Sequence, residues 1–257
     1  WVATADYGDD LRIGPEILKG QADLYRRVRN TLRYLLGSLD GFTAKERVTP
    51  AEMPELERWI LHRLWEIDKL VRASTESFDF KALLIGVHNF CAVDLSAFYF
   101  DVRKDSLYCD APDATRRRAC RTVLDLIFEH LTAWLAPILC FTAEEAHLAR
   151  DASRKDSGDS VHLRDFPHVP EAWRDPALAE RWDKLRRLRR VVTGALELER
   201  AERRIGSSLQ AAPTIHADAA TLAALQGIDL AEVAITSGVT LVAGAPPAGA
   251  FTLPDVA

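Results

Sequence analysis

Four polar residues, spaced by three or four positions, share one face of a helix predicted over residues 15–39: Arg26, Arg29, Asn30 and Arg33. Arginines one helical turn apart can hold successive phosphate groups through paired N–H donors, and an asparagine amide can bond to a base or a ribose. This pattern is compatible with a nucleic-acid contact. The alternative interpretation is an ordinary solvated helix face.

A second basic surface is predicted on a later helix. From Arg181 to Arg190 the chain has six basic residues and a single acid, and Arg200, Arg203 and Arg204 follow. Such a cluster is compatible with nucleic-acid binding, and a solvated helix face is again the alternative.

Catalytic and metal-binding motifs are sparse. Glu144 and His147 form one Glu-x-x-His step, whereas a di-iron site in a helical bundle needs two such steps. A surface or capping role therefore suits this pair better, and no metal site is predicted. His88 lies in an apolar stretch and is expected to be a core histidine. Asp94 lies in the same stretch, so its carboxylate must find a hydrogen bond or an ion pair inside the fold.

The net charge hides an uneven distribution. The 257 residues contain 33 Lys and Arg against 38 Asp and Glu, which gives −5. No Lys or Arg occurs from residue 205 to residue 257, so all the basic residues lie in the preceding part of the chain. The composition, with 48% hydrophobic residues, excludes disordered, collagen-like and disulfide-rich secreted classes.

Hydrophobic periodicity predicts a mainly α fold, in which a bundle of long helices is followed by a charged helix and a small α/β unit. A capping box of Thr142 and Glu145 is expected to open the fifth bundle helix. The predicted helices are 15–39, 54–78, 80–103, 115–135, one from 142, 176–204 and 219–226, and the predicted strands are 161–166, 214–217, 233–236 and 239–243.

The cysteines indicate the cellular compartment of the protein, and the first residues indicate whether the sequence is part of a longer chain. Cys91, Cys120 and Cys140 fall in apolar helical patterns, so they are expected to be reduced core residues of a cytoplasmic protein. The chain starts at Trp1 and its only methionine is Met53, which indicates an excerpt or a processed product. No signal-peptide pattern and no uninterrupted apolar run of about 18 residues occurs, so no membrane association is expected.

Five sequence blocks, in order, carry a family resemblance. They are WVATADYGDDLRIGPEILK at 1–19, YRRVRNTLRYLLGSLDGF at 25–42, HNFCAVDLSAFYFDVRKDSLYCDAP at 88–112, WLAPILCFTAEE at 134–145 and RIGSSL at 204–209. Together they resemble the anticodon-binding region of the isoleucyl-tRNA synthetases, which are class I aminoacyl-tRNA synthetases. Leucyl- and valyl-tRNA synthetases share this helical bundle, and their equivalent region remains an alternative, but the first and last blocks are most similar to the isoleucine enzymes.

The sequence departs from the family pattern at several points. Gly14 stands where members usually have a Ser or Thr helix cap, and Arg204 replaces a usual Lys. AHLAR follows FTAEE where the family tends to have Ile-Trp, so the fifth helix is expected to pack differently. The His-x-Gly-His and Lys-rich ATP signatures, the editing domain and the zinc-binding cysteines of many bacterial members are all missing.

The resemblance implies a tRNA-binding C-terminal fragment of an isoleucine–tRNA ligase. The full enzyme would use ATP and Mg to activate isoleucine and charge its tRNA, with editing of valine, because an apolar pocket discriminates one methylene weakly. The fragment itself is expected to hold no catalytic residue and no cofactor, to bind isoleucine tRNA and to be monomeric; zinc would belong to a C-terminal module absent here. The predicted tRNA contacts are Arg26, Arg29, Asn30, Arg33, Arg103, Lys104, Arg186 and Arg190.

The predicted organisation has five parts. They are a connection at 1–14, the anticodon-binding bundle at 15–150, a linker at 151–172, the charged helix at 173–205 and the small α/β unit at 206–257. Two other function classes remain open from the residues alone. One is an all-α scaffold that binds proteins, and the other is an enzyme with an unrecognised site in the small unit around His216, Asp218, Asp229 and Glu232.

Overall fold

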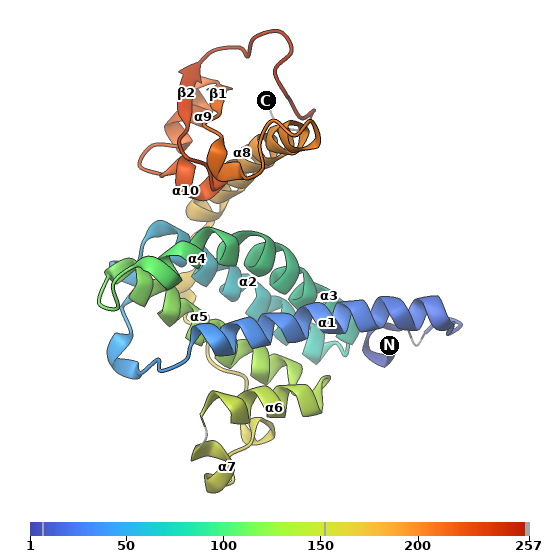
Figure 1. The fold of residues 1–257 in the computed structure, drawn as a ribbon. Coiled ribbons are helices and arrows are strands. Elements are labelled where there is room, and N and C mark those ends of the chain that lie inside the picture. Colours follow the sequence, from blue (N-terminus) through green and yellow to red (C-terminus); the bar gives the residue numbers. More distant parts are fainter. Residues whose placement is uncertain (7, 152, 255–257) are drawn as a thin grey trace. The chain divides into compact units, whose positions relative to one another are not determined.

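The computed structural model describes residues 1–6, 8–151 and 153–254 (Figure 1). The chain divides into two compact units, residues 1–174 and 175–257. Positions 7, 152 and 255–257, which fall in the predicted connection, linker and C-terminal unit, lie outside the described residues.

The first unit is a helical bundle, as the sequence predicted. Its helices bury apolar stripes against one another, and α5 lies at the centre, with fourteen of its residues buried. The elements are α1 (Pro15–Ser38), α2 (Glu55–Glu76), α3 (Phe80–Asn89), a π-helical segment (Phe90–Tyr99), α4 (Phe100–Cys109), α5 (Thr115–Leu135), α6 (Cys140–Arg150) and α7 (Ser153–Ser157).

The central apolar helix is longer than predicted. It continues through the π-helical segment to Cys109 rather than ending near Arg103. It is the one described helix that is long and apolar enough to cross a membrane, but 56% of the apolar window is buried inside the structure, which is typical of a core helix. Within it, Asp94 accepts hydrogen bonds from Arg63 Nε and Nη2 at 3.2 and 3.0 Å. The predicted internal partner of Asp94 is thus confirmed.

A tight turn joins α2 to α3. Phe78 takes a left-handed φ of 60°, and Asp79 N donates to Ser74 O at 2.8 Å, which closes the end of α2. Asp79 then caps α3 by accepting from Ala82 N at 2.9 Å. A glycine usually occupies such a position, so the phenylalanine there is strained.

Three predictions for the first unit are wrong. The expected strand at 161–166 is a 3₁₀ turn (Val161–Leu163) followed by irregular chain. The Thr142–Glu145 capping box is not formed, because α6 begins two residues earlier, at Cys140. Cys91 and Cys120 are buried as expected, but Cys140 is exposed at that helix start.

The second unit contains the charged helix α8 (Pro176–Ala201) and a small α/β part. A two-stranded parallel sheet pairs β1 (Thr214–Ala217) with β2 (Thr240–Ala243), and α9 (Ala219–Ala224) and α10 (Leu230–Ala234) connect them. The predicted strand at 233–236 is wrong, because Asp229 caps a short helix there by accepting from Glu232 N at 3.1 Å.

A glycine on α8 brings the C-terminal segment close to the helix. A Cβ atom built on Gly194 would lie 2.6 Å from the Phe251 ring, so only glycine admits this packing. The segment after β2 is therefore packed on α8 at Phe251.

Candidate nucleic-acid interface

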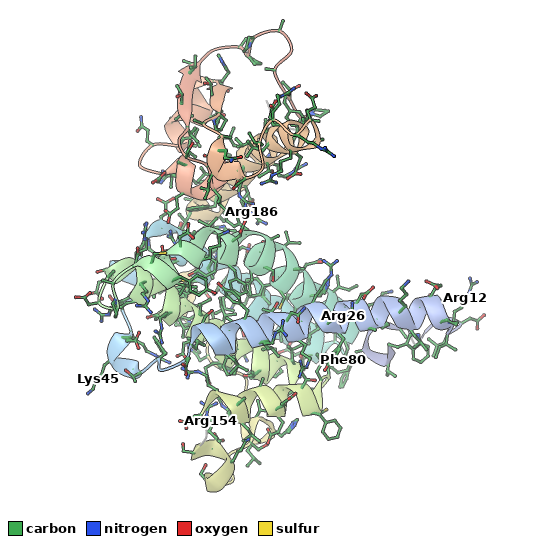
Figure 2. All side chains as sticks on the ribbon, viewed as in Figure 1. Arg12, Arg26, Lys45, Phe80, Arg154 and Arg186 are labelled. Carbon is green, nitrogen blue, oxygen red and sulfur yellow. The ribbon has the colours of Figure 1, made fainter. Side chains whose placement is uncertain are left out.

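The polar face of α1 is held in place by the burial of the opposite side of the helix. Val28, Leu32 and Leu35 are almost wholly buried in the bundle. Arg26, Arg29, Asn30 and Arg33 are all exposed, as their spacing predicted (Arg26 is labelled in Figure 2). We call these four residues the α1 basic face.

The ion pairs of the α1 basic face are weak. Arg26 Nη1 lies 2.8 Å from Asp23 Oδ1, one turn back on the same helix, and the two side chains are 68% and 50% exposed. Arg29 Nη2 lies 3.5 Å from Glu145 Oε2. Exposed pairs of this kind contribute about 0–1 kcal/mol, so a phosphate can replace the carboxylate at little cost.

The other two members carry no competing partner. Within the described part of the chain, the side chains of Asn30 and Arg33 make no hydrogen bond or ion pair with protein groups. Their donors therefore face solvent and can be offered to an external acceptor without breaking a contact.

The start of α6 lies beside the α1 basic face. The Tyr25 hydroxyl and Thr142 Oγ1 are 2.9 Å apart, and Glu145 reaches Arg29 from the same helix. The residues expected to form a capping box thus contact α1 instead. These contacts show that α1 and the start of α6 lie side by side.

Arg103 is placed where no external phosphate can reach it. Its side chain is 4% exposed, and its Nε and Nη2 donate to Glu57 Oε1 and Oε2 at 2.6 and 2.8 Å. Glu57 is fully buried, so the guanidinium is required to balance an internal charge. We therefore correct the expectation that Arg103 contacts tRNA. Its neighbour Lys104 is exposed, with Nζ 3.3 Å from Asp101 Oδ1.

The basic cluster of α8 is only partly available. Arg181 Nε donates to Ala224 O at 2.9 Å and also contacts the carbonyl of Gln226, while Arg189 Nε donates to Val233 O at 2.8 Å. These carbonyls lie near the ends of α9 and α10, where helical hydrogen bonding leaves acceptors unsatisfied. Of the two predicted contacts, Arg190 is exposed and Arg186 is half-buried.

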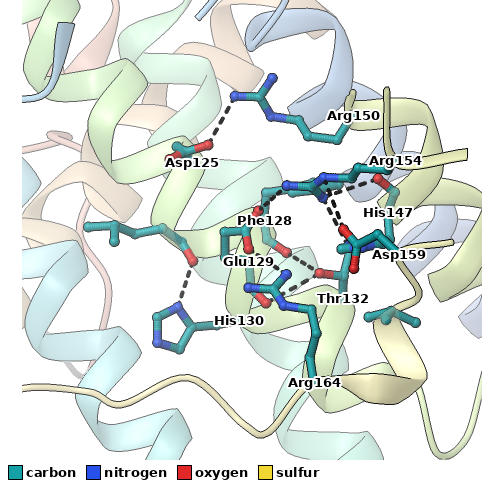
Figure 3. Close-up of polar contacts among 12 residues, drawn as sticks. Asp125, Phe128, Glu129, His130, Thr132, His147, Arg150, Arg154, Asp159 and Arg164 are labelled. Carbon is teal, nitrogen blue, oxygen red and sulfur yellow. Dashed lines mark hydrogen bonds and ion pairs between the residues drawn. The ribbon is translucent and has the colours of Figure 1, made fainter. Parts of the chain in front are cut away.

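Sequence reasoning missed a charged cluster beside α5. Asp125 and Glu129, one turn apart on that helix, are each paired with two arginines from other segments, and Figure 3 shows three of these four arginines. Two acids one turn apart in the mainly apolar second half of the helix were the available signal. The arginines are Arg47 and Arg150 on Asp125, and Arg154 and Arg164 on Glu129.

Glu144 and His147 are used structurally. Glu144 Oε2 accepts from Ser160 Oγ at 3.1 Å and from Val161 N at 2.9 Å, so it caps the following turn. His147 is buried between Asp159 and Arg154 (Figure 3). Among the described residues, no group of three or more His, Cys, Asp or Glu side chains is placed to hold a metal ion.

The two buried thiols, Cys91 and Cys120, are unreactive at neutral pH. Burial raises the pKa of Cys91 and of Cys120 to about 12, so both remain protonated at neutral pH. Neither Cys91 nor Cys120 is therefore available as a nucleophile.

Comparison with known proteins places most of the chain in one family. Residues 57–215 match the family described as the anticodon-binding domain of tRNA ligase. The whole chain is 57% identical to an isoleucine–tRNA ligase of Ruegeria pomeroyi, 52% identical to one of Caulobacter vibrioides and 50% identical to one of Agrobacterium fabrum. In each comparison the chain spans 26% of the length of the relative.

Proposed function

Because the chain belongs to the family of anticodon-binding domains of tRNA ligases, we propose that it binds the anticodon stem and loop of isoleucine tRNA as part of an isoleucine–tRNA ligase. The whole enzyme would activate isoleucine with ATP and Mg, charge the tRNA and hydrolyse the ester of tRNA mischarged with valine, in the cytoplasm and as a monomer. The described region would contribute no reacting group. Its part is to hold the RNA so that the acceptor end reaches a catalytic site elsewhere in the enzyme.

The observation that supports tRNA binding is the α1 basic face. Three arginines and one asparagine are exposed on a helix whose other side is buried, so their positions are fixed before the RNA arrives. The backbone that carries these donors is thus ordered before binding, and only the rotamer freedom of each side chain is lost on contact with a phosphate. We retain three residues as secondary tRNA contacts: Lys104, Arg186 and Arg190. We leave out Arg103, because it is buried and paired with Glu57.

The test is a salt titration of tRNA binding. Arg29→Glu and Arg33→Glu are expected to weaken binding, and a variant that removes one phosphate contact should reduce the slope of log K against log salt by about 0.7–0.9. Thermal unfolding should be unchanged, because both side chains are exposed. Arg58→Glu is the matched control, since Arg58 is an exposed arginine of α2 outside the proposed surface.

Two results would contradict the proposal. Equal affinities of Arg29→Glu, Arg33→Glu and the unchanged chain at low salt would show that the α1 basic face is a solvated surface. Equal binding of isoleucine, valine and leucine tRNAs would remove the isoleucine assignment while leaving RNA binding intact.

A further inference from the structure

One tyrosine of the first unit is left almost uncovered near the end of α4. Tyr108 is 74% exposed. In the part of the chain that the structure describes, its hydroxyl makes no hydrogen bond and its ring contacts no other aromatic ring. A single exposed ring is ordinary on a protein surface, so its neighbours decide whether it has a role.

The row of α4 residues that leads to Tyr108 begins at a contact with α1. The Phe100 ring stacks on the ring of Tyr34, with their centroids 4.1 Å apart. Lys104 and Tyr108 follow Phe100 at intervals of four positions, so the three side chains form one row along the helix. Each step of four residues turns this row by about 40° around the helix axis. The exposed fraction rises accordingly, from 6% at Phe100 against α1 to 74% at Tyr108 in solvent.

Tyr34 connects this row to the α1 basic face. It follows Arg33 in the chain and lies one turn after Asn30, and both of those residues belong to the face. Burial raises the pKa of Tyr34 to about 12, and the nearby Tyr108 is the next largest cause of the shift. The two tyrosines therefore lie close enough to interact. The α1 basic face thus continues across Tyr34 to Lys104 and Tyr108 on α4.

Lys104 is available to a phosphate beside Tyr108. Its Nζ lies 3.3 Å from Asp101 Oδ1, and the two side chains are 45% and 41% exposed, so a phosphate can replace this carboxylate at little cost. Side chains four positions apart on a helix have Cβ atoms about 5–6 Å apart. A base on the Tyr108 ring therefore brings its own phosphate within reach of Lys104.

The other acids of α4 and its C-terminal cap do not oppose such a contact. Asp110 accepts from Nε and Nη2 of Arg116 at 2.9 and 3.0 Å, which balances its charge. Asp105 is placed about 140° around the helix from Phe100, so it lies on the side away from α1. The surface at Tyr108 is therefore close to neutral, which suits an uncharged base, while the α1 basic face supplies the positive charge for the backbone.

A second exposed ring beside the α1 basic face has different surroundings. Phe141 is 92% exposed, and one turn later on the same helix stands Glu145, whose side chain is 66% exposed. Phe141 thus has an acid where Tyr108 has a lysine, and an acid repels a phosphate. The residues just before it, Ile138 and Leu139, line an apolar hollow. Phe141 is therefore the matched control for Tyr108.

We propose that Tyr108 stacks on one unpaired base of the anticodon loop, while Lys104 holds the phosphate of that nucleotide and the α1 basic face holds the neighbouring backbone. The proposal rests on the tRNA binding proposed above and names a contact within it. Aromatic side chains stack on every type of base, so Tyr108 positions the loop and does not read its sequence.

The experiment is a cycle between protein variants and RNA variants. The probe is an anticodon stem–loop RNA of isoleucine tRNA, made with an abasic nucleotide at each loop position in turn. Tyr108→Ala is expected to bind the intact stem–loop roughly 5- to 150-fold more weakly than the unchanged chain. Removing the stacked base should cost the unchanged chain a similar factor, and should cost Tyr108→Ala almost nothing further.

Further variants separate stacking from charge. Tyr108→Phe keeps the ring and should remain within about threefold of the unchanged chain. Lys104→Ala should reduce the slope of log K against log salt by about 0.7, whereas Tyr108→Ala should leave the slope unchanged, because stacking releases no counterion. Phe141→Ala should bind every stem–loop as the unchanged chain does. Circular dichroism checks the fold, and Tyr108→Ala should keep its melting temperature because the ring is exposed.

The outcomes separate this proposal from the function it rests on. If folded Tyr108→Ala binds the intact stem–loop as tightly as the unchanged chain, no base stacks on Tyr108, although RNA binding stands. If each abasic position costs the same in both proteins, the base stacks elsewhere. Equal losses in Tyr108→Ala and Tyr108→Phe, or in Tyr108→Ala and Phe141→Ala, would also overturn the proposal. If the unchanged chain binds no stem–loop at low salt, the proposed function itself fails.

Discussion

The buried pair of Glu57 and Arg103 allows a quantitative prediction. Glu57 has no exposed surface, and its two carboxylate oxygens accept from Nε and Nη2 of Arg103 at 2.6 and 2.8 Å. The Tyr99 hydroxyl also donates to Oε1 at 3.1 Å. The pair joins α2 to α4 across 46 positions of sequence. Replacing Arg103 by Met leaves this carboxylate without its charge partner in the bundle interior.

The size of the effect follows from the burial. Breaking a buried ion pair by removing one partner costs about 3–5 kcal/mol. With a urea m-value of about 2 kcal/mol per molar, the unfolding midpoint of Arg103→Met should fall by roughly 1.5–2.5 M. Replacing both residues, as in Glu57→Leu with Arg103→Met, should recover most of the loss, because no unpaired charge remains.

Urea unfolding monitored by tryptophan fluorescence measures this, since five of the six tryptophans lie in the first unit. Lys104→Met is the matched control and should change the free energy of unfolding by less than about 0.5 kcal/mol, because Lys104 is exposed. The tRNA affinity of the folded Arg103→Met protein should be unchanged. A midpoint equal to that of the unchanged chain, together with weaker tRNA binding, would refute the reasoning and return Arg103 to the RNA surface.

Three further predictions concern stability. Asp94→Ala should lower the free energy of unfolding by about 1–3 kcal/mol, because Nε and Nη2 of Arg63 lose their acceptor and only the contact of Nη1 with Glu66 remains; an unchanged melting temperature would show that Asp94 is solvated. Phe78→Gly removes left-handed strain from a side chain that is 65% exposed, so the free energy of unfolding should rise by about 1 kcal/mol or less, and a clear loss would show that the ring supports the turn. Since burial lowers the pKa of His130, the unfolded chain binds its proton more readily, and stability should fall as pH drops below about 6.5, by at most about 1.4 kcal/mol per pH unit for this group. Urea unfolding at pH 7.5 and 5.5 measures this, and an identical pH dependence in His130→Gln would contradict it.

The long helices were predictable because their buried faces repeat. The predicted range 115–135 coincides with α5, and α1 starts at Pro15 as expected. In a run of only four apolar or β-branched residues, hydrophobic periodicity does not distinguish a helix from a strand. The predicted strand at 233–236 therefore proved to be the end of α10 and the residues after it. There the Asp229 cap was the better signal.

The candidate site could be predicted only where the spacing of residues along one helix determines which side chains are exposed. The α1 basic face follows from the period of one helix. The burial of Arg103 depends on Glu57, and the charged cluster beside α5 pairs Arg47 with Asp125 across 78 positions. Neither contact leaves a trace in the residues next to each arginine. The available signal lay in the acids instead, because Glu57 and Asp125 fall on the buried sides of their helices and a buried carboxylate requires a base as its partner.

The partners of each arginine therefore indicate whether it stabilises the fold or is available to bind RNA. Arg103 balances a buried acid and Arg181 holds carbonyls of the C-terminal unit, so neither can release its donors without destabilising the fold. Arg26 and Arg29 have exposed acids as partners, and exchanging those for phosphate costs almost nothing. If RNA recognition uses arginines whose partners are exposed, charge reversal at Arg29 should change the affinity for tRNA and not the unfolding free energy, whereas removal of Arg103 should do the reverse. A variant at either position that changed both quantities together would break this separation.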